Sequence, residues 1–220
     1  VTNILDYLEQ TAQRLPEKIA LADDKLCLTF SQWIQQAECI GTAIALATNS
    51  TIRRAVLVFV DRRVEGLVGA MGAVESGNFY VPIDCKMPFE RVRLIADVCK
   101  PIAAVATTAV DLKTLDQIEF DGPRFLYDDV KEQEADKEIL AVIREQIIDL
   151  DPVYSIFTSG STGVPKGVVI SHRGMIDLAN WLVETFKFTD KDALGNQTPF
   201  YFDGSVKDIV ICIKSGATLN

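Results

Sequence analysis

The sequence of 220 residues contains one histidine, His172, and five cysteines without a Cys-x-x-Cys pair. A single histidine excludes a multi-histidine metal site, and the odd, irregularly spaced cysteines fit neither a zinc site nor a disulfide framework. We therefore expect reduced, buried thiols and no metal site built by these residues. A Ser-His-Asp triad would depend on His172, for which the sequence places no partners, so we expect this residue to cap or to pack.

Long apolar runs and an excess of basic residues are also absent. The longest apolar stretches, Ala55–Val60 and Gly66–Val74, are shorter than the roughly 20 residues of a membrane-spanning helix. The first nine residues carry acids and no basic group, unlike a signal peptide, so we predict a cytoplasmic protein without a membrane span. The net charge of −9 argues against a nucleic-acid partner, because DNA and RNA binders generally carry a basic face.

The composition is that of an ordinary globular protein, with 48% hydrophobic and 24% charged residues. The length suits one large domain or two small ones. In the first part of the chain, the spacing of apolar and turn residues predicts a helix over 3–15 capped by Asn3, a β-hairpin of strands 19–22 and 26–30, and a helix over 31–46 capped by Ser31.

Strands then alternate with helices. Ala55–Val60 is a continuous apolar run, typical of a buried parallel strand. The pattern continues with helix 64–76, strand 79–81, helix 89–98, strands 102–106, 153–158 and 168–170, helix 173–186, a strand over 194–198 and helix 205–213. This alternation indicates βαβ units and an α/β fold of mostly parallel sheets flanked by helices. The acid-rich stretch 128–138 is interpreted as a solvated face without chemistry.

The most informative stretch is 158–167, TSGSTGVPKG, which directly follows a predicted strand. Its glycines let the backbone turn with positive φ and let a ligand approach closely. Successive backbone N–H groups can hold an anion. The four hydroxyl side chains add donors, and Lys166 adds one positive charge suited to a terminal phosphate. The stretch therefore predicts a polyphosphate-binding loop.

Other interpretations of this loop fit less well. A Walker loop ends in Gly-Lys-Ser/Thr and is followed by a helix, whereas here Pro165 precedes Lys166 and Gly167 leads into a predicted strand. A G-x-G-x-x-G dinucleotide fingerprint is absent. A flexible Gly/Ser linker is disfavoured because the stretch lies between two apolar, β-branched runs.

The longer segment 154–168, YSIFTSGSTGVPKGV, resembles the phosphate-loop signature of the adenylate-forming superfamily. That superfamily includes nonribosomal peptide synthetase adenylation domains, D-alanine–carrier-protein ligases and acyl-CoA synthetases. Three other stretches agree in order and spacing: 28–31 (LTFS), where Phe30, Trp33 and Ile34 depart from the usual L-T-Y-x-E-L, 75–84 (ESGNFYVPID), with Pro88 and Arg91 after it, and 200–205 (FYFDGS), which resembles F-D-x-S.

The resemblance implies that residues 1–220 are the N-terminal part of an AMP-binding (adenylation) domain. A division of this part into subregions 1–150 and 151–220 stays open. It implies that ATP and Mg²⁺ are used to form an acyl-adenylate, which is then passed to a thiol. The ATP phosphates would contact Thr158, Ser159, Gly160, Ser161, Thr162, Gly163 and Lys166. The catalytic lysine, an acidic Mg²⁺ ligand and the contacts to adenine and ribose are expected after Asn220, so we expect the 220 residues alone to be inactive.

Within the resemblance, Asp203 narrows the class of substrate. In the amino-acid-activating branch this aspartate pairs with the α-ammonium group, whereas acyl-CoA synthetases usually lack it. Its alternative role is that of a helix N-cap. The implied substrate-binding residues are Phe202, Asp203, Gly204 and Lys207. Lys207 would suit an acidic side chain such as that of glutamate, although a lysine early in a helix is more commonly exposed to solvent.

The sequence thus predicts an enzyme that adenylates an amino acid and loads it onto the phosphopantetheine thiol of a carrier protein. A D-alanine–carrier-protein ligase shares Asp203 and stays as an alternative, and an acyl-CoA synthetase fits less well. A non-catalytic nucleotide-binding or interaction module is the alternative from another class. The residues after Asn220 and an assay of amino-acid-dependent pyrophosphate exchange would discriminate among these.

Overall fold

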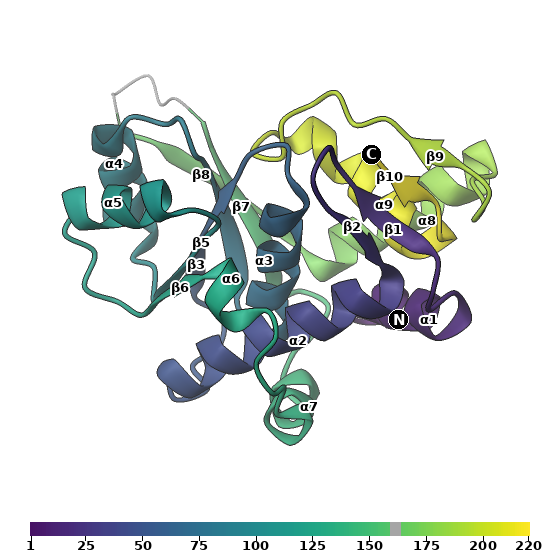
Figure 1. Cartoon of the computed structure of the whole chain (residues 1–220), viewed down its shortest axis with the longest axis horizontal. Coiled ribbons are helices and arrows are strands. Elements are labelled where there is room, and N and C mark those ends of the chain that lie inside the picture. Colours follow the sequence, from purple (N-terminus) through teal and green to yellow (C-terminus); the bar gives the residue numbers. More distant parts are fainter. Residues whose placement is uncertain (159–163) are drawn as a thin grey trace.

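The computed structural model describes residues 1–158 and 164–220. Within these ranges the chain forms two β-sheets whose faces are covered by helices (Figure 1). Both sheets contain strands from each side of residue 150. One hydrophobic cluster extends across them, because it includes Val56 of the larger sheet and both Leu21 and Leu219 of the smaller one.

The larger sheet carries six strands in the described residues. In their order across the sheet they are β6 (Arg124–Leu126), β5 (Ala103–Ala106), β3 (Ala55–Val60), β4 (Phe79–Asp84), β7 (Pro152–Thr158) and β8 (Lys166–Ser171). Neighbouring strands are parallel except for β7 and β8, which pair antiparallel. The parallel strands are joined through helices, because a parallel connection must return the chain to the same end of the sheet.

Strand β3 shows why the larger sheet is buried on both faces. Val56 and Val58 pack into the cluster that holds α3 (Val64–Glu75), which is backed by α2 (Phe30–Ala47). The alternate residues Leu57 and Phe59 pack with α4 (Phe89–Cys99) and α5 (Ala109–Gln117) on the opposite face. Side chains alternate across a strand, so a strand covered on both faces must be apolar throughout.

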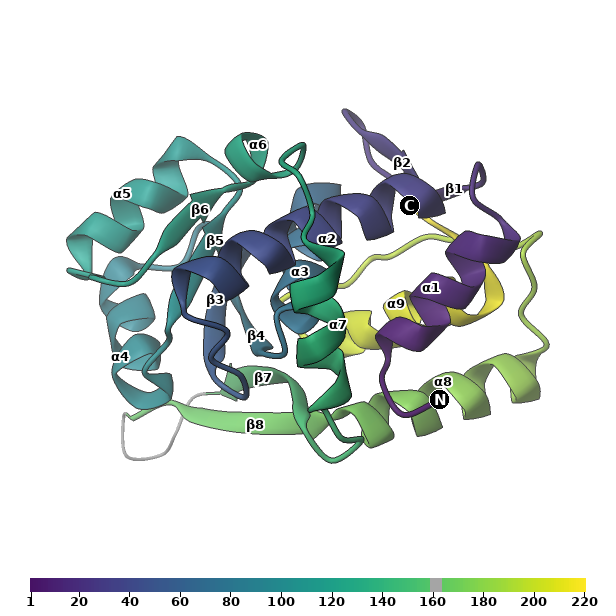
Figure 2. The ribbon, with the colours of Figure 1, turned by 90° about the horizontal axis from the view of Figure 1, so that it is seen from below.

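The smaller sheet joins the two ends of the chain. Its strands are β2 (Cys27–Thr29), β1 (Ile19–Ala22), β10 (Thr218–Leu219) and β9 (Ala193–Leu194), in that order. Leu21 of β1 lies opposite Leu219 of β10 in parallel pairing. The helices α1 (Leu5–Arg14), α8 (His172–Phe186) and α9 (Val206–Ser215) pack together beside this sheet (Figure 2).

The remaining elements are α6 (Tyr127–Val130), α7 (Lys137–Glu145) and the 3-10 turn η1 (Asp203–Ser205). Helix α7 packs on α2. The acid-rich stretch 128–138 therefore spans most of α6, a connecting segment and the beginning of α7. None of the helices in the described ranges is both long enough and apolar enough to cross a membrane.

The structure confirms the α/β class, the parallel sheet and the N-terminal hairpin, but it corrects some of the predicted details. Thr29, not Ser31, caps α2, because its hydroxyl accepts a hydrogen bond from Gln32 N–H and the Gln32 side chain bonds back. The strand predicted over 194–198 is reduced to β9, since the Asn196 side chain bonds to the Thr198 backbone and turns the chain away. Elements α5, β6, α6 and α7 were not predicted.

Candidate active site

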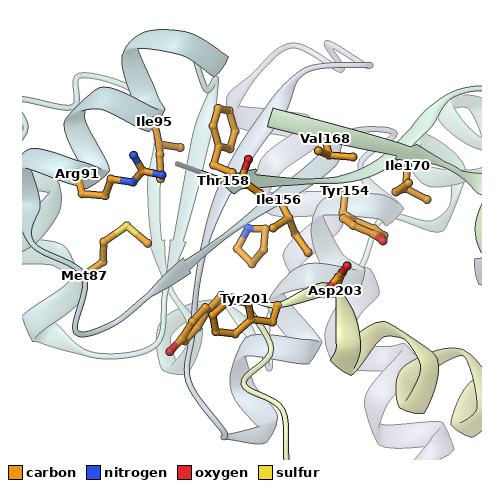
Figure 3. Close-up of a pocket in the computed structure, with 13 residues that line it drawn as sticks. Met87, Arg91, Ile95, Tyr154, Ile156, Thr158, Val168, Ile170, Tyr201 and Asp203 are labelled. Atoms are coloured by element: carbon orange, nitrogen blue, oxygen red, sulfur yellow. The ribbon is translucent and has the colours of Figure 1, made fainter. Parts of the chain in front are cut away.

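A cavity of about 470 Å³ opens beside the last strands of the larger sheet. It lies between the β7–β8 pair, the beginning of α4 and the segment that leads into α9 (Figure 3). Apolar side chains form most of its wall. The lining residues are Pro82, Met87, Arg91, Ile95, Tyr154, Ile156, Phe157, Thr158, Val168, Ile170, Tyr201, Phe202 and Asp203. Arg91 and Asp203 are the charged members of this set, and they lie on opposite sides of the cavity (Figure 3).

Strand β7 brings Thr158, the residue at which the predicted phosphate loop begins, to this cavity. Thr158, the last described residue before the loop, is exposed and lines the cavity. It pairs in register with Lys166, the first residue of β8, whose carbonyl accepts a hydrogen bond from the Thr158 hydroxyl at 3.5 Å. Lys166 is exposed and is not among the residues that line the cavity. The predicted phosphate contacts Ser159, Gly160, Ser161, Thr162 and Gly163 lie outside the described residues.

Gly167 allows the two strands to approach at this point. A Cβ atom at residue 167 would stand 2.7 Å from the Ser155 hydroxyl and 2.9 Å from the Phe157 ring. Real Cβ atoms do not approach other atoms so closely, so a larger residue would push β8 away from β7. The Pro-Lys-Gly sequence therefore also has a packing role, which its glycine supplies.

The opposite end of the cavity is formed by Asp203, at the beginning of η1. The turn is fixed by its own backbone, since Phe202 N–H donates to Pro199 C=O at 2.9 Å and the Ser205 hydroxyl donates to Phe202 C=O at 2.7 Å. The Asp203 side chain does not cap α9 and is exposed at the cavity. The predicted N-cap role of Asp203 is therefore not observed, and its carboxylate is available to a ligand.

Two tyrosines support the Asp203 side of the cavity. The Tyr154 and Tyr80 rings lie 5.6 Å apart between centroids, and Tyr80 is buried in the core. Burial, together with the neighbouring Asp203 carboxylate, raises the pKa of the Tyr154 hydroxyl. Tyr154 therefore stays protonated at neutral pH, with its hydroxyl beside the Asp203 carboxylate (Figure 3).

The other predicted substrate-binding residues differ in whether they line the cavity. Phe202 is 52% exposed and lines the cavity, whereas Gly204, in the middle of η1, is not part of the wall. Lys207 lies in the first turn of α9, and its ammonium group is bound to the Asp208 carboxylate at 3.1 Å. Lys207 does not line the cavity, and the Asp208 carboxylate already neutralises its charge.

Arg91 lines the cavity, although the sequence did not single it out as a site residue. There it is visible only as part of a motif, but α4 places its half-buried side chain in the cavity wall. The sequence does carry one hint. A positive charge in the first turn of a helix interacts unfavourably with the helix dipole, so an arginine there suggests a role other than helix stability. Sequence alone could not show which strand end the first turn of α4 faces.

His172 is buried at the beginning of α8, away from the cavity. Its Nδ1 accepts a hydrogen bond from Ile4 N–H at 3.1 Å, so it serves the beginning of α1, while Ser171 caps α8. Burial, helped by the Arg144 charge, lowers the pKa of His172 to about 4. Within residues 1–158 and 164–220 no group of three His, Cys, Asp or Glu side chains is placed to hold a metal ion.

Known proteins resemble this chain in sequence and in fold. The family described as AMP-binding enzyme matches residues 8–220. The D-alanine–D-alanyl carrier protein ligase of Staphylococcus aureus (strain JH9) is 31% identical over all 220 residues, which cover 42% of that protein. The chain thus spans less than half the length of this curated relative.

Solved structures show the same fold. The structure of the nonribosomal peptide synthetase FmoA3 with α-methyl-L-serine-AMP bound has a TM-score of 0.85 and 24% identity, and the match covers 99% of this chain and 23% of that one. The complex of VinN with L-aspartate has a TM-score of 0.83 and 17% identity, and covers 100% of this chain and 63% of that one. The fold, the motifs and the match over residues 8–220 lead to one conclusion: this chain belongs to the AMP-binding enzyme family.

Proposed function

We propose that the protein carrying this chain uses ATP to activate an amino acid as an aminoacyl-adenylate and then passes the aminoacyl group to the phosphopantetheine thiol of a carrier protein. The observation that carries the proposal is that Asp203 lines the same cavity as Thr158. A carboxylate suited to an ammonium group therefore shares one space with the beginning of the hydroxyl-and-glycine loop. The whole activity would require residues beyond this chain, so we propose that the 220 residues alone are inactive.

The first step joins two anions, so the protein must hold them in line and neutralise charge. An oxygen of the amino acid carboxylate forms a bond to the α-phosphorus of ATP. The bond from that phosphorus to the bridging oxygen breaks, and pyrophosphate leaves with the electron pair. In this proposal Asp203 holds the substrate ammonium, and residues 158–163 with Lys166 hold the β- and γ-phosphates.

In the second step the carrier thiol loses its proton, and its sulfur attacks the acyl carbon while AMP leaves.

Mg²⁺, when bound with ATP, neutralises phosphate charge. Mg²⁺ is commonly held by one or two carboxylates together with the phosphates. We propose that the nucleotide phosphates supply most of its ligands and that one acidic side chain of the complete protein supplies a further one.

Among amino acids, D-alanine is the first candidate, because the curated relative at 31% identity is a D-alanine–D-alanyl carrier protein ligase. The proposal that Lys207 selects an acidic side chain has less support, since Lys207 is paired with Asp208. An acyl-CoA synthetase would leave the exposed Asp203 carboxylate without a partner in a largely apolar cavity.

Pyrophosphate exchange into ATP by the complete protein tests the proposal. Each D- and L-amino acid is offered separately, with acetate and octanoate as carboxylates that lack an ammonium group. We expect exchange with one or a few amino acids and none with the simple carboxylates. Equal exchange with octanoate would contradict the assigned role of Asp203, and no exchange with any carboxylate would favour a non-catalytic module.

A further inference from the structure

The Arg91 guanidinium lines the cavity without an anion to balance it. It makes no ion pair with any residue of 1–158 or 164–220, and residues 159–163 contain no acid by sequence. Its neighbours in the wall include Met87 and Ile95 from the same side of the cavity (Figure 3). Arg91 is partly exposed, and its guanidinium beside these apolar groups is free to form charge-assisted hydrogen bonds with the carboxylate or phosphate of a ligand.

The position of Arg91 indicates which anion it meets. Asp203, on the opposite side of the cavity, repels anions and suits the substrate ammonium group (Figure 3). Arg91 instead shares its side of the cavity with Thr158, where the hydroxyl-and-glycine loop begins. We propose that Arg91 contacts the β- or γ-phosphate of ATP and holds the departing pyrophosphate, an inference that rests on the proposed function.

The proposed contact has a clear chemical use. Negative charge accumulates on the pyrophosphate as the α-phosphorus–oxygen bond breaks, and a fixed guanidinium stabilises that charge without transferring a proton. The planar guanidinium can donate two parallel hydrogen bonds to one phosphate, which a lysine cannot do. Arg91, placed by a helix, would thus supplement Lys166, which stands at the beginning of β8.

The test compares Arg91→Gln and Arg91→Lys in the complete protein, using exchange kinetics with ATP, pyrophosphate and the preferred amino acid. Arg93→Gln is the matched control, because Arg93 lies on the same helix but is exposed and bonds to the Gln117 carbonyl outside the cavity. For Arg91→Gln we expect the KM for ATP and for pyrophosphate to rise about tenfold or more. The KM for the amino acid should change less than twofold, Arg91→Lys should be intermediate, and the control should match the wild type.

A rise in the amino acid KM with unchanged ATP and pyrophosphate constants would overturn the proposal, since Arg91 would then hold the substrate carboxylate. Unchanged KM values for ATP, pyrophosphate and the amino acid in Arg91→Gln would overturn the proposal as well. Calorimetric titration of the complete protein with sodium pyrophosphate needs no turnover, and equal binding by wild type and Arg91→Gln would also refute the contact. Binding that is weakened in Arg91→Gln, with no exchange for any amino acid, would support the contact while removing the proposed function. Thermal unfolding of each variant controls for misfolding.

Discussion

Arg144, which is partly exposed, forms an ion pair with the buried Glu75, with 3.1 Å between the guanidinium and the Glu75 Oε2 atom. Glu75 is 4% exposed, and its second oxygen has no hydrogen-bond partner among the described residues. Arg144 also bonds to Asp6 at 3.1 Å and to Glu9 at 2.8 Å. The pair therefore ties α7 to the end of α3 and to α1. Burial raises the pKa of Glu75 to about 7, although the Arg144 charge opposes this.

Replacing Arg144 should destabilise the protein. Arg144→Met leaves Glu75 buried without its cation. Because protonation of Glu75 removes part of the cost of the unpaired charge, we expect the free energy of unfolding to fall by roughly 2–3 kcal/mol. Arg173→Met is the control, because Arg173 forms a more exposed pair with Asp149 and should cost less than about 1 kcal/mol. Urea unfolding at pH 7 measures both. Equal losses would contradict the special role of Arg144.

Glu75 should make stability depend on pH in one direction. Because its folded-state pKa is raised, the native state holds the proton more tightly, and this stabilisation is complete below about pH 4.5 and lost as the pH rises through about 7. Glu75→Gln removes the titration. The stability of the wild type relative to this variant should therefore fall by on the order of 2 kcal/mol between pH 4.5 and 7.5. A pH-independent difference in urea midpoints would show that Glu75 titrates normally.

His172 should make the folding stability depend on pH in the opposite direction. Its folded-state pKa is lowered to about 4, so the unfolded chain takes up the proton first and stability falls as the pH drops from about 6.5 towards 4. His172→Gln keeps an acceptor for Ile4 N–H but does not titrate. Between pH 7 and pH 5 the wild type should lose on the order of 1–2 kcal/mol more than this variant. NMR titration of the single histidine provides an independent measurement of its pKa.

The close packing of α2 on α3 depends on Gly41. A Cβ atom there would lie 2.5 Å from the Glu75 Cβ, so Gly41→Ala must push the helices apart. We expect a loss of roughly 1–2 kcal/mol, in spite of the better helix propensity of alanine. Gly195→Ala is the control, because a Cβ at that residue meets nothing within 4 Å. In thermal unfolding, the midpoint temperature should fall for Gly41→Ala and stay unchanged for Gly195→Ala.

Asp203 should decide whether an ammonium group is recognised. Asp203→Asn keeps the size of the side chain but removes its charge, and we expect the amino acid KM in pyrophosphate exchange to rise about tenfold or more. Asp177→Asn, an exposed acid on α8, is the control and should leave the exchange unchanged. Unaltered amino acid kinetics in Asp203→Asn would refute the contact with the ammonium group.

Local sequence was informative where local physics decides the outcome. The continuous apolar run of β3 already implied a strand covered on both faces, and the turn residues between β1 and β2 implied a hairpin. Caps were less certain, because both Thr29 and Ser31 carry a suitable hydroxyl and only the backbone geometry shows at which residue the helix begins, with Thr29 accepting from Gln32 N–H. The two motifs at the cavity, around Thr158 and Asp203, were also visible as residue types in order.

The sequence by itself determined the α/β class, the family resemblance and the kinds of group that can meet phosphate and ammonium. Only the tertiary structure decided which of these groups share a space. Arg91 of α4 and Asp203 of η1 lie on opposite sides of one cavity although they are distant in the chain, while Lys207 does not line it and is paired with Asp208. Such neighbours are set by long-range packing, which leaves no periodic pattern in the sequence.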